Sequence, residues 1–270
     1  MTKETTAIQN PDKNTGIQIF DYGEDAGKGY ENQSKADLSM PFINLLQSGS
    51  PLVKDGKARA GDFFNTVTQQ IWPRETGLLF VPGSTKQMFA EWVPRKQGGG
   101  FRGHHQVNDE IVLNAIKNAA KFGKYLTPEG NNLNDTFYVY GALCTEDGVA
   151  DSMCVIPFWS TKIRPYKAWN SRLRTFNMQH GNKIPLFANL VRMTSRETQN
   201  SEGEFYIPVL SSADPRGIGY SLLGPDDERF QMAKACAQLV MSGDADINYG
   251  KSREAEGDDE DGEKKDGNPF

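Results

Sequence analysis

Cationic and aromatic side chains gather in one acid-free stretch of this sequence. From Ser152 to Arg196 there is no Asp or Glu, although these two types make up 35 of the 270 residues. Cations neutralise phosphates and release counterions, while flat rings stack on bases whatever the base sequence. The stretch therefore predicts a surface for single-stranded nucleic acid. Its bases are Lys162, Arg164, Lys167, Arg172, Arg174, Lys183, Arg192 and Arg196, and the rings among them are Phe158, Trp159, Tyr166, Trp169, Phe176 and Phe187.

Part of this stretch also has a purely structural interpretation. Trp169, Leu173 and Phe176 recur at spacings of three and four, which is typical of the buried face of a helix, so we expect them to lie in the core. The cations on that helix are either solvated or line a DNA-binding groove, and we favour the groove. The predicted DNA contacts from this stretch are Trp159, Lys162, Arg164, Tyr166, Lys167, Arg172, Arg174 and Arg192.

A second basic and aromatic cluster surrounds the three consecutive glycines at 98–100. Such a run costs too much backbone entropy for a regular element, so we expect 96–103 to be a mobile loop that closes over a strand of DNA. No GxxxxGK[ST] pattern is present, and nucleotide hydrolysis is not predicted. The predicted DNA contacts here are Trp92, Arg95, Lys96, Phe101 and Arg102, with His104 and His105 beside them.

Residues that catalysis or metal binding would need are scattered along the chain. Three widely spaced cysteines give neither a zinc motif nor a disulfide framework, and two adjacent histidines do not converge on one metal. A nuclease would have to assemble its metal ligands from distant carboxylates. We therefore predict no enzyme, no catalytic residue, no metal and no cofactor. The residues considered are Cys144, Cys154, Cys236, His104, His105, Asp109, Glu110, Asp135 and Asp147.

Charge is divided unequally between the body and the C-terminal end. The formal net charge is −5, but residues 244–270 hold ten acids and four bases, which leaves the preceding body near +1. A segment so charged and so poor in apolar residues does not fold by itself. Its last residues nevertheless present an apolar ring beside a free carboxylate, which suits a small hydrophobic pocket rimmed by cations on a partner. The predicted partner-binding residues are Asp258, Asp259, Glu260, Asp261, Pro269 and Phe270.

This tail resembles the C-termini of bacterial and phage single-stranded-DNA-binding proteins, which run through an acidic segment to Pro-Phe or Phe. The resemblance covers about the last dozen residues and departs from the bacterial pattern at Lys264-Lys265 and Gly267-Asn268. It implies that the tip recruits polymerase, primase, helicase or nuclease partners and competes with DNA for the basic surface. The middle of the chain, from KADLSMPFINLLQ to EWVPRKQGGGF, resembles uncharacterised phage replication-region proteins.

The elements that must position these residues are mostly strands. Runs rich in β-branched and aromatic residues predict a first barrel strand from GLLFVP and MFAEWV together, and further strands at DTFYVYGALC, ADSMCVIPFWS, IPLFANLVRM and GEFYIPVL. Capping residues and glycines predict helices from Asn108 to Gly123, from Ser160 or Thr161 to Gly181, and from Asp226 to Gly243. The order predicts a mainly β, α+β fold: an OB-fold-like five-stranded barrel with an inserted helical loop and a C-terminal helix.

We expect a flexible N-terminal segment (1–34), an OB-like nucleic-acid-binding domain (35–243, insertion about 96–134) and a disordered acidic tail (244–270). No apolar run approaches the roughly 20 residues of a membrane helix, and no secretory signal precedes the body, so we expect a cytoplasmic protein without a membrane partner. The predicted function is coating of single-stranded DNA in replication, recombination or repair. A strand-annealing recombination protein and a phage structural protein are the alternatives. Homo-oligomer formation and the choice between DNA and RNA stay open.

Overall fold

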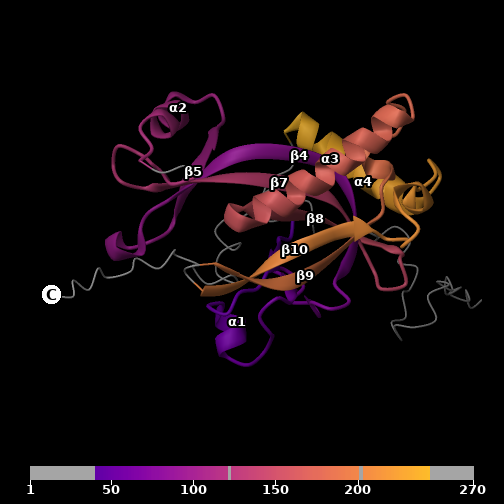
Figure 1. The fold of residues 1–270 in the computed structure, drawn as a ribbon, viewed down its shortest axis with the longest axis horizontal. Helices are drawn as coiled ribbons and strands as arrows, with labels where there is room; N and C mark the ends of the chain where they lie inside the picture. Colours follow the sequence, from indigo (N-terminus) through magenta and orange to yellow (C-terminus); the bar gives the residue numbers. More distant parts are fainter. Residues whose placement is uncertain (1–39, 121–122, 201–202, 244–270) are drawn as a thin grey trace, which may run out of the picture. The chain divides into compact units, whose positions relative to one another are not determined.

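The computed structural model describes residues 40–120, 123–200 and 203–243, so the predicted segment 1–34 and the acidic tail lie outside the described residues. The elements follow one another along the chain as shown in Figure 1. In order they are β1 (Ile43–Leu45), α1 (Pro51–Lys54), β2 (Phe63–Asn65), β3 (Ile71–Trp72), β4 (Leu78–Trp92), η3 (Arg95–Gln97), β5 (Phe101–Gln106), α2 (Glu110–Lys117), β6 (Tyr125–Leu126), β7 (Asn132–Cys144), β8 (Ala150–Trp159), η4 (Ser160–Lys162), α3 (Ile163–Gln179), η5 (Leu186–Ala188), β9 (Val191–Asn200), β10 (Gly203–Ser212), η6 (Ile218–Ser221) and α4 (Glu228–Ser242).

One large antiparallel sheet organises the described residues, and it contains seven of their strands. β4 and β7 pair along most of their lengths at its centre. In one half the order is β8-β7-β4-β9-β10, and in the other half β5 pairs with β4 and β6 pairs with β7. The coarse prediction of an α+β fold is confirmed. Among the described residues, no helix is long and apolar enough to span a membrane.

β4 joins GLLFVP and MFAEWV, two strand-like runs that together form the first strand of the predicted barrel. Pro82-Gly83 marks a bulge rather than a break, because the register with β7 shifts between Pro82 and Ser84 and pairing then continues. Gly83 also allows α4 to approach, since a Cβ at this position would lie 2.3 Å from the carbonyl oxygen of Ala233. The result is one 15-residue strand that runs through both halves of the sheet.

The two long helices lie on opposite faces of this sheet. Successive residues of a strand point to opposite faces. Leu78 and Phe80 belong to the main core, to which α3 contributes its buried side chains. Leu79 and Val81 pack instead with Ala233 of α4. We call these two sides the α3 face and the α4 face.

The segment that contains β1, from Pro41 to Gln47, lies between the outer edges of β8 and β10. The Val155 amide donates to the Pro41 carbonyl at 3.0 Å on the β8 side. On the β10 side, the amide group of Gln47 donates to the Tyr206 carbonyl at 3.0 Å and accepts from the Tyr206 N–H at 2.8 Å. Gln47 thus takes the place of a neighbouring strand and satisfies the backbone of β10.

The inserted helix α2 is shorter than predicted. Its N-cap is Asp109 rather than Asn108, and the Asp109 carboxylate accepts a hydrogen bond from the Gln106 N–H at 2.7 Å. The helix ends at Lys117, well before Gly123, because the chain must turn back to pair β6 with β7.

The C-terminal helix α4 is confirmed, with a boundary one residue later than predicted. Asp227, not Asp226, is the N-cap, and its side chain accepts from the Arg229 N–H. Gly243 ends the helix in the left-handed conformation at φ 80°, as its position in the sequence predicts.

The predicted mobile loop at 96–103 is wrong in its second half. Gly98 to Gly100 all have positive φ, which suits glycine. Phe101 then begins β5, which pairs with β4 from Trp92↔Phe101 to Met88↔Gln106. The edge of β4 supplies hydrogen-bond partners for the backbone of 101–106. These bonds stabilise a strand next to the glycines, where the local sequence alone predicts a loop.

Candidate nucleic-acid interface

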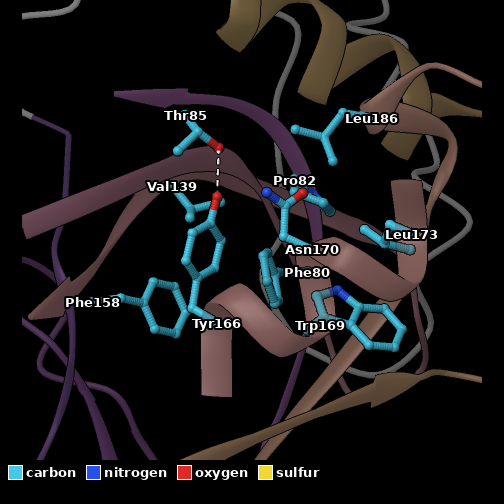
Figure 2. Close-up of a pocket in the computed structure, with 10 residues that line it drawn as sticks. All are labelled: Phe80, Pro82, Thr85, Val139, Phe158, Tyr166, Trp169, Asn170, Leu173 and Leu186. Carbon is cyan, nitrogen blue, oxygen red and sulfur yellow. Dashed lines mark hydrogen bonds between the residues drawn. The ribbon is translucent and has the colours of Figure 1, made fainter. Parts of the chain in front are cut away.

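The rings on the inner side of α3 belong to the core. Tyr166, Trp169 and Leu173 are all at least 93% buried, which confirms the structural interpretation for Trp169 and Leu173. Figure 2 shows them around a cavity of about 10 Å³, room for about one water molecule. The Tyr166 hydroxyl donates to Thr85 Oγ1 at 3.2 Å. Tyr166 is therefore not available to stack on a base, and the cavity is too small to receive one.

Three predicted cations share one exposed flank of α3, which we call the α3 stripe: Arg164, Lys167 and Arg174. Spacings of three and seven residues bring side chains to the same side of a helix. The stripe borders β7, because the Lys167 ammonium lies 4.8 Å from the ring centroid of half-buried Phe137. A cation and a flat ring therefore lie side by side at this flank.

Arg172 lies on the other flank of α3. Its guanidinium donates to the Leu210 carbonyl of β10 at 3.3 Å and lies 5.1 Å from the ring centroid of Trp169. Its side chain is still exposed, so it adds positive charge to the helix without joining the α3 stripe.

The α3 cations have no carboxylate partners in the described part of the chain. No carboxylate lies within 4.0 Å of Arg164, Lys167, Arg172 or Arg174 there. Some cations elsewhere on the described surface are neutralised, as the ion pairs Arg59–Glu75, Arg74–Glu75, Arg216–Asp214 and Arg229–Asp227 show. α3 itself contains no acid.

The sequence of the folded body is more cationic than the whole chain suggests. Residues 40–243 hold 22 Lys or Arg and 18 Asp or Glu, a formal charge of +4. Five of those acids pair with Lys or Arg outside α3, whereas α3 carries no acid and four cations that are unpaired within the described ranges, so this helix adds a local excess of positive charge. A polyanion is the ligand that such a surface attracts.

Three further predicted contacts lie apart from the α3 stripe. Half-buried Trp159 ends β8, and the ammonium of Lys162, itself buried, lies 5.2 Å from its ring centroid. Arg192 pairs in register with Leu79, which faces α4, so it lies on the opposite face of the sheet from α3. Its guanidinium donates to the Thr76 carbonyl at 3.0 Å.

The second predicted cluster forms a row of rings at the far end of β4, β5 and β7. Trp92 contacts Phe101 at 5.2 Å between centroids, Phe101 contacts His104 at 4.7 Å, and His104 contacts Tyr138 at 5.4 Å. Tyr138 packs with Cys236 of α4, which places the row on the α4 face. Phe101 and His104 are half-buried, while Trp92 and Tyr138 are buried.

The two adjacent histidines in this cluster point to opposite faces, as strand geometry requires. His104 Nε2 lies 3.0 Å from the Tyr138 hydroxyl, and burial lowers the pKa of His104 to about 4, so it is neutral at pH 7. His105 instead contacts the Glu91 carboxylate at 2.7 Å. Burial raises the Glu91 pKa, but hydrogen bonds from Asn131 and His105 outweigh it and lower that pKa overall. The pair does not converge on a metal.

The cations of the second cluster are peripheral. Lys96, in η3, and Arg102, in β5, are exposed. Arg95 also belongs to η3, but its side chain lies outside what the structure describes. The predicted tail contacts, from Asp258 to Phe270, lie outside the described residues as well.

The cysteines of this protein lie in the interior of the fold. The three cysteines are free and buried. Burial raises the pKa of Cys144 and of Cys236 to about 12 and that of Cys154 well above its usual value, so each stays a thiol. Within the described ranges, no group of three His, Cys, Asp or Glu side chains is placed to hold a metal ion.

Sequence reasoning missed Phe137 and Tyr220. Phe137 pairs with Phe158 and lies on the same face of the sheet as Val139. Alternate residues of a strand share a face, so the run DTFYVYG contains the information that groups Phe137 with Val139. Tyr220 is the only Phe, Tyr or Trp among the described residues that is exposed. Nothing in the surrounding letters distinguishes it from a core tyrosine.

A family model for the Pam3 phage gp34-like protein matches residues 12–246. The chain therefore belongs to the Pam3 phage gp34-like family. No curated protein and no solved structure matches the chain.

Proposed function

We propose that this gp34-like family member binds single-stranded DNA without strong sequence preference, with phosphates held along α3. The observation that carries the proposal is the set of four exposed α3 cations that have no carboxylate partner among the described residues. Even a surface ion pair stabilises a fold only slightly, and these cations form none with the described residues, so they do not stabilise the helix by ion pairing. A strand of phosphates supplies the missing anions.

The ring beside the α3 stripe supports a single strand rather than a duplex. Phosphate contacts alone do not distinguish the two, but unpaired bases expose faces that stack on aromatic side chains. Phe137 is half-buried beneath Lys167, so a base that displaces the ammonium would stack on this ring while Lys167 binds the neighbouring phosphate. The row from Trp92 to Tyr138 offers further rings on the α4 face.

The order of strands supports an OB-type, partly open barrel as the fold that carries this surface. Numbered along the chain, β4, β7, β8, β9 and β10 are strands one to five, and strand one pairs with two and four, two with three, and four with five. α3 connects the third strand to the fourth. OB folds commonly bind oligonucleotides.

The tail sequence supports a second part of the proposal. Its acidic run and Pro269-Phe270 tip suit recruitment of replication or recombination enzymes, such as a polymerase, helicase, primase or nuclease. Deleting 258–270 removes negative charge that competes with DNA, so DNA affinity should stay the same or rise. A large loss of affinity on deletion would contradict this part.

The test is anisotropy titration of a labelled dT oligomer with the full chain. The triple variant Arg164→Gln/Lys167→Gln/Arg174→Gln should bind about 100-fold more weakly at 0.1 M salt, since each lost single-strand phosphate contact removes roughly 0.7 log unit there. The control is Lys54→Gln/Lys117→Gln/Lys234→Gln, which removes the same charge from exposed, scattered positions. It should stay within about threefold of wild type.

Two outcomes would overturn the proposal. Wild-type protein that does not bind the oligomer at low salt rejects the function itself. Equal losses in the two triple variants show that net charge, not α3, controls binding. An annealing assay with complementary strands then separates a coating protein from an annealing protein, because only the latter accelerates pairing.

A further inference from the structure

Tyr220 is presented to solvent by a short turn between β10 and α4. It is 64% exposed, whereas every other Phe, Tyr and Trp among the described residues is buried or half-buried. An exposed ring of this size gains little from the fold, because its apolar surface remains in water. Its position calls for another explanation.

The turn holds the Tyr220 ring in place from behind. The Arg216 guanidinium carbon lies 4.3 Å from the ring centroid, and Arg216 in turn donates to both carboxylate oxygens of Asp214, at 3.0 and 2.7 Å. The Asp214 N–H donates to Ser221 Oγ at 2.8 Å, which ties both ends of the turn together. Hydrogen bonds from Arg216 lower the pKa of Asp214 to about 2, so this pair stays ionised at neutral pH.

The same turn is anchored to α3. Gly219 lies against the ring of Phe176, since a Cβ on Gly219 would sit 3.4 Å from Phe176 Cζ. Ile218 packs against the main core. Phe176 follows Arg172 by one helical turn, so Tyr220 adjoins the flank of α3 that carries Arg172.

We propose that Tyr220 is a stacking platform for an unpaired nucleobase of a strand that crosses α3, with its phosphates on the α3 cations, of which Arg172 lies on the flank next to Tyr220. This inference rests on the proposed function and adds an exposed ring that contacts bases. Because the Arg216 fork is already occupied by Asp214, this turn contributes a ring rather than a phosphate contact. The face of a tyrosine stacks on any base, which fits binding without strong sequence preference.

The experiment compares Tyr220→Ala with Tyr220→Phe on two ligands of equal length and charge, a dT oligomer and a fully abasic oligomer. Tyr220→Ala should weaken dT binding about tenfold, which corresponds to one stacked base. Tyr220→Phe keeps the ring and should stay within about twofold. Neither variant should change affinity for the abasic oligomer, which offers phosphates but no bases.

The outcomes separate this inference from the proposed function. If wild type binds dT and Tyr220→Ala binds equally well, Tyr220 is no platform, although the proposed function stands. An equal loss on both ligands shows that the substitution disturbs the phosphate surface and also overturns the inference. If wild type does not bind dT at all, the proposed function fails first. Unfolding curves of the variants should match that of wild type, because the side chain is exposed.

Discussion

α3 and α4 are two helices of similar length that perform the same structural task on opposite faces of one sheet. α3 buries Tyr166, Trp169 and Leu173 against the main core. α4 buries Ala233 and other small or apolar side chains against the reverse sides of β4, β7 and β8. Judged by their inner faces, both helices stabilise the sheet.

Their outer surfaces differ. α4 carries both signs of charge, and its Arg229 is neutralised by Asp227 at 2.7 Å. α3 carries four exposed cations and no acid. Packing against the sheet fixes the inner face of each helix but leaves its outer face unconstrained. A cationic outer face of this kind attracts polyanions, and this difference from α4 is the reason that we propose α3 as the DNA-binding helix.

The largest effect we expect comes from the inner face of α3. Trp169→Ala removes a side chain that is 5% exposed and should lower the free energy of unfolding by about 4 kcal/mol, measured by urea denaturation. The Arg164→Gln/Lys167→Gln/Arg174→Gln variant should unfold within about 1.5 kcal/mol of wild type, since surface changes cost about 0.5 kcal/mol each. If both variants lost a similar amount of unfolding free energy, the outer face of α3 would be as important for stability as the inner face, which would contradict the account.

The inner face of α4 should respond at the point where the helix approaches β4 most closely. Gly83→Ala places a Cβ 2.3 Å from the Ala233 carbonyl oxygen, so the helix must shift, at a cost of about 2 kcal/mol in unfolding free energy. Gly103→Ala is the matched control, because a Cβ there meets nothing within 4 Å. DNA affinity of folded Gly83→Ala should equal that of wild type. If Gly83→Ala lowered DNA affinity without lowering the free energy of unfolding, α4 and not α3 would be the helix that contacts DNA.

The smallest effect concerns the ion pair between Asp227 and Arg229 at the start of α4. Asp227→Ala removes the N-cap and should cost about 1 kcal/mol at pH 7. Arg229 lowers the pKa of Asp227, so the charged part of this stabilisation is present above the unfolded pKa near 4 and is lost as the pH falls through the folded value. The stability gap between wild type and variant should narrow between pH 7 and pH 3 in thermal melts. A gap of constant size would show that charge plays no part.

The sequence predicts α3 well because local information suffices there. The three-and-four spacing of its apolar residues identifies the buried face, and Gly181, at φ 70°, follows its end as predicted. The cations between those apolar positions are then exposed by helical geometry alone. For this reason the three members of the α3 stripe are recognisable from the sequence.

Predictions failed where distant pairing decides the outcome. β5 forms in a glycine-rich stretch because the edge of β4 is adjacent. The sequence groups Arg192 with the α3 cations, yet strand parity sends it to the other face. Tyr220 owes its exposure to a turn whose Asp214–Arg216 clamp has no sequence signature.

The most direct test of the central claim is the salt dependence of dT-oligomer affinity in wild type and in the Arg164→Gln/Lys167→Gln/Arg174→Gln variant. If these three cations neutralise phosphates, the slope of log affinity against log salt should be shallower by about 2 in the variant, at about 0.7 per contact. The scattered-lysine control should keep the wild-type slope. Parallel slopes for wild type and the α3 variant would contradict the account, because the α3 stripe would then release no counterions on binding.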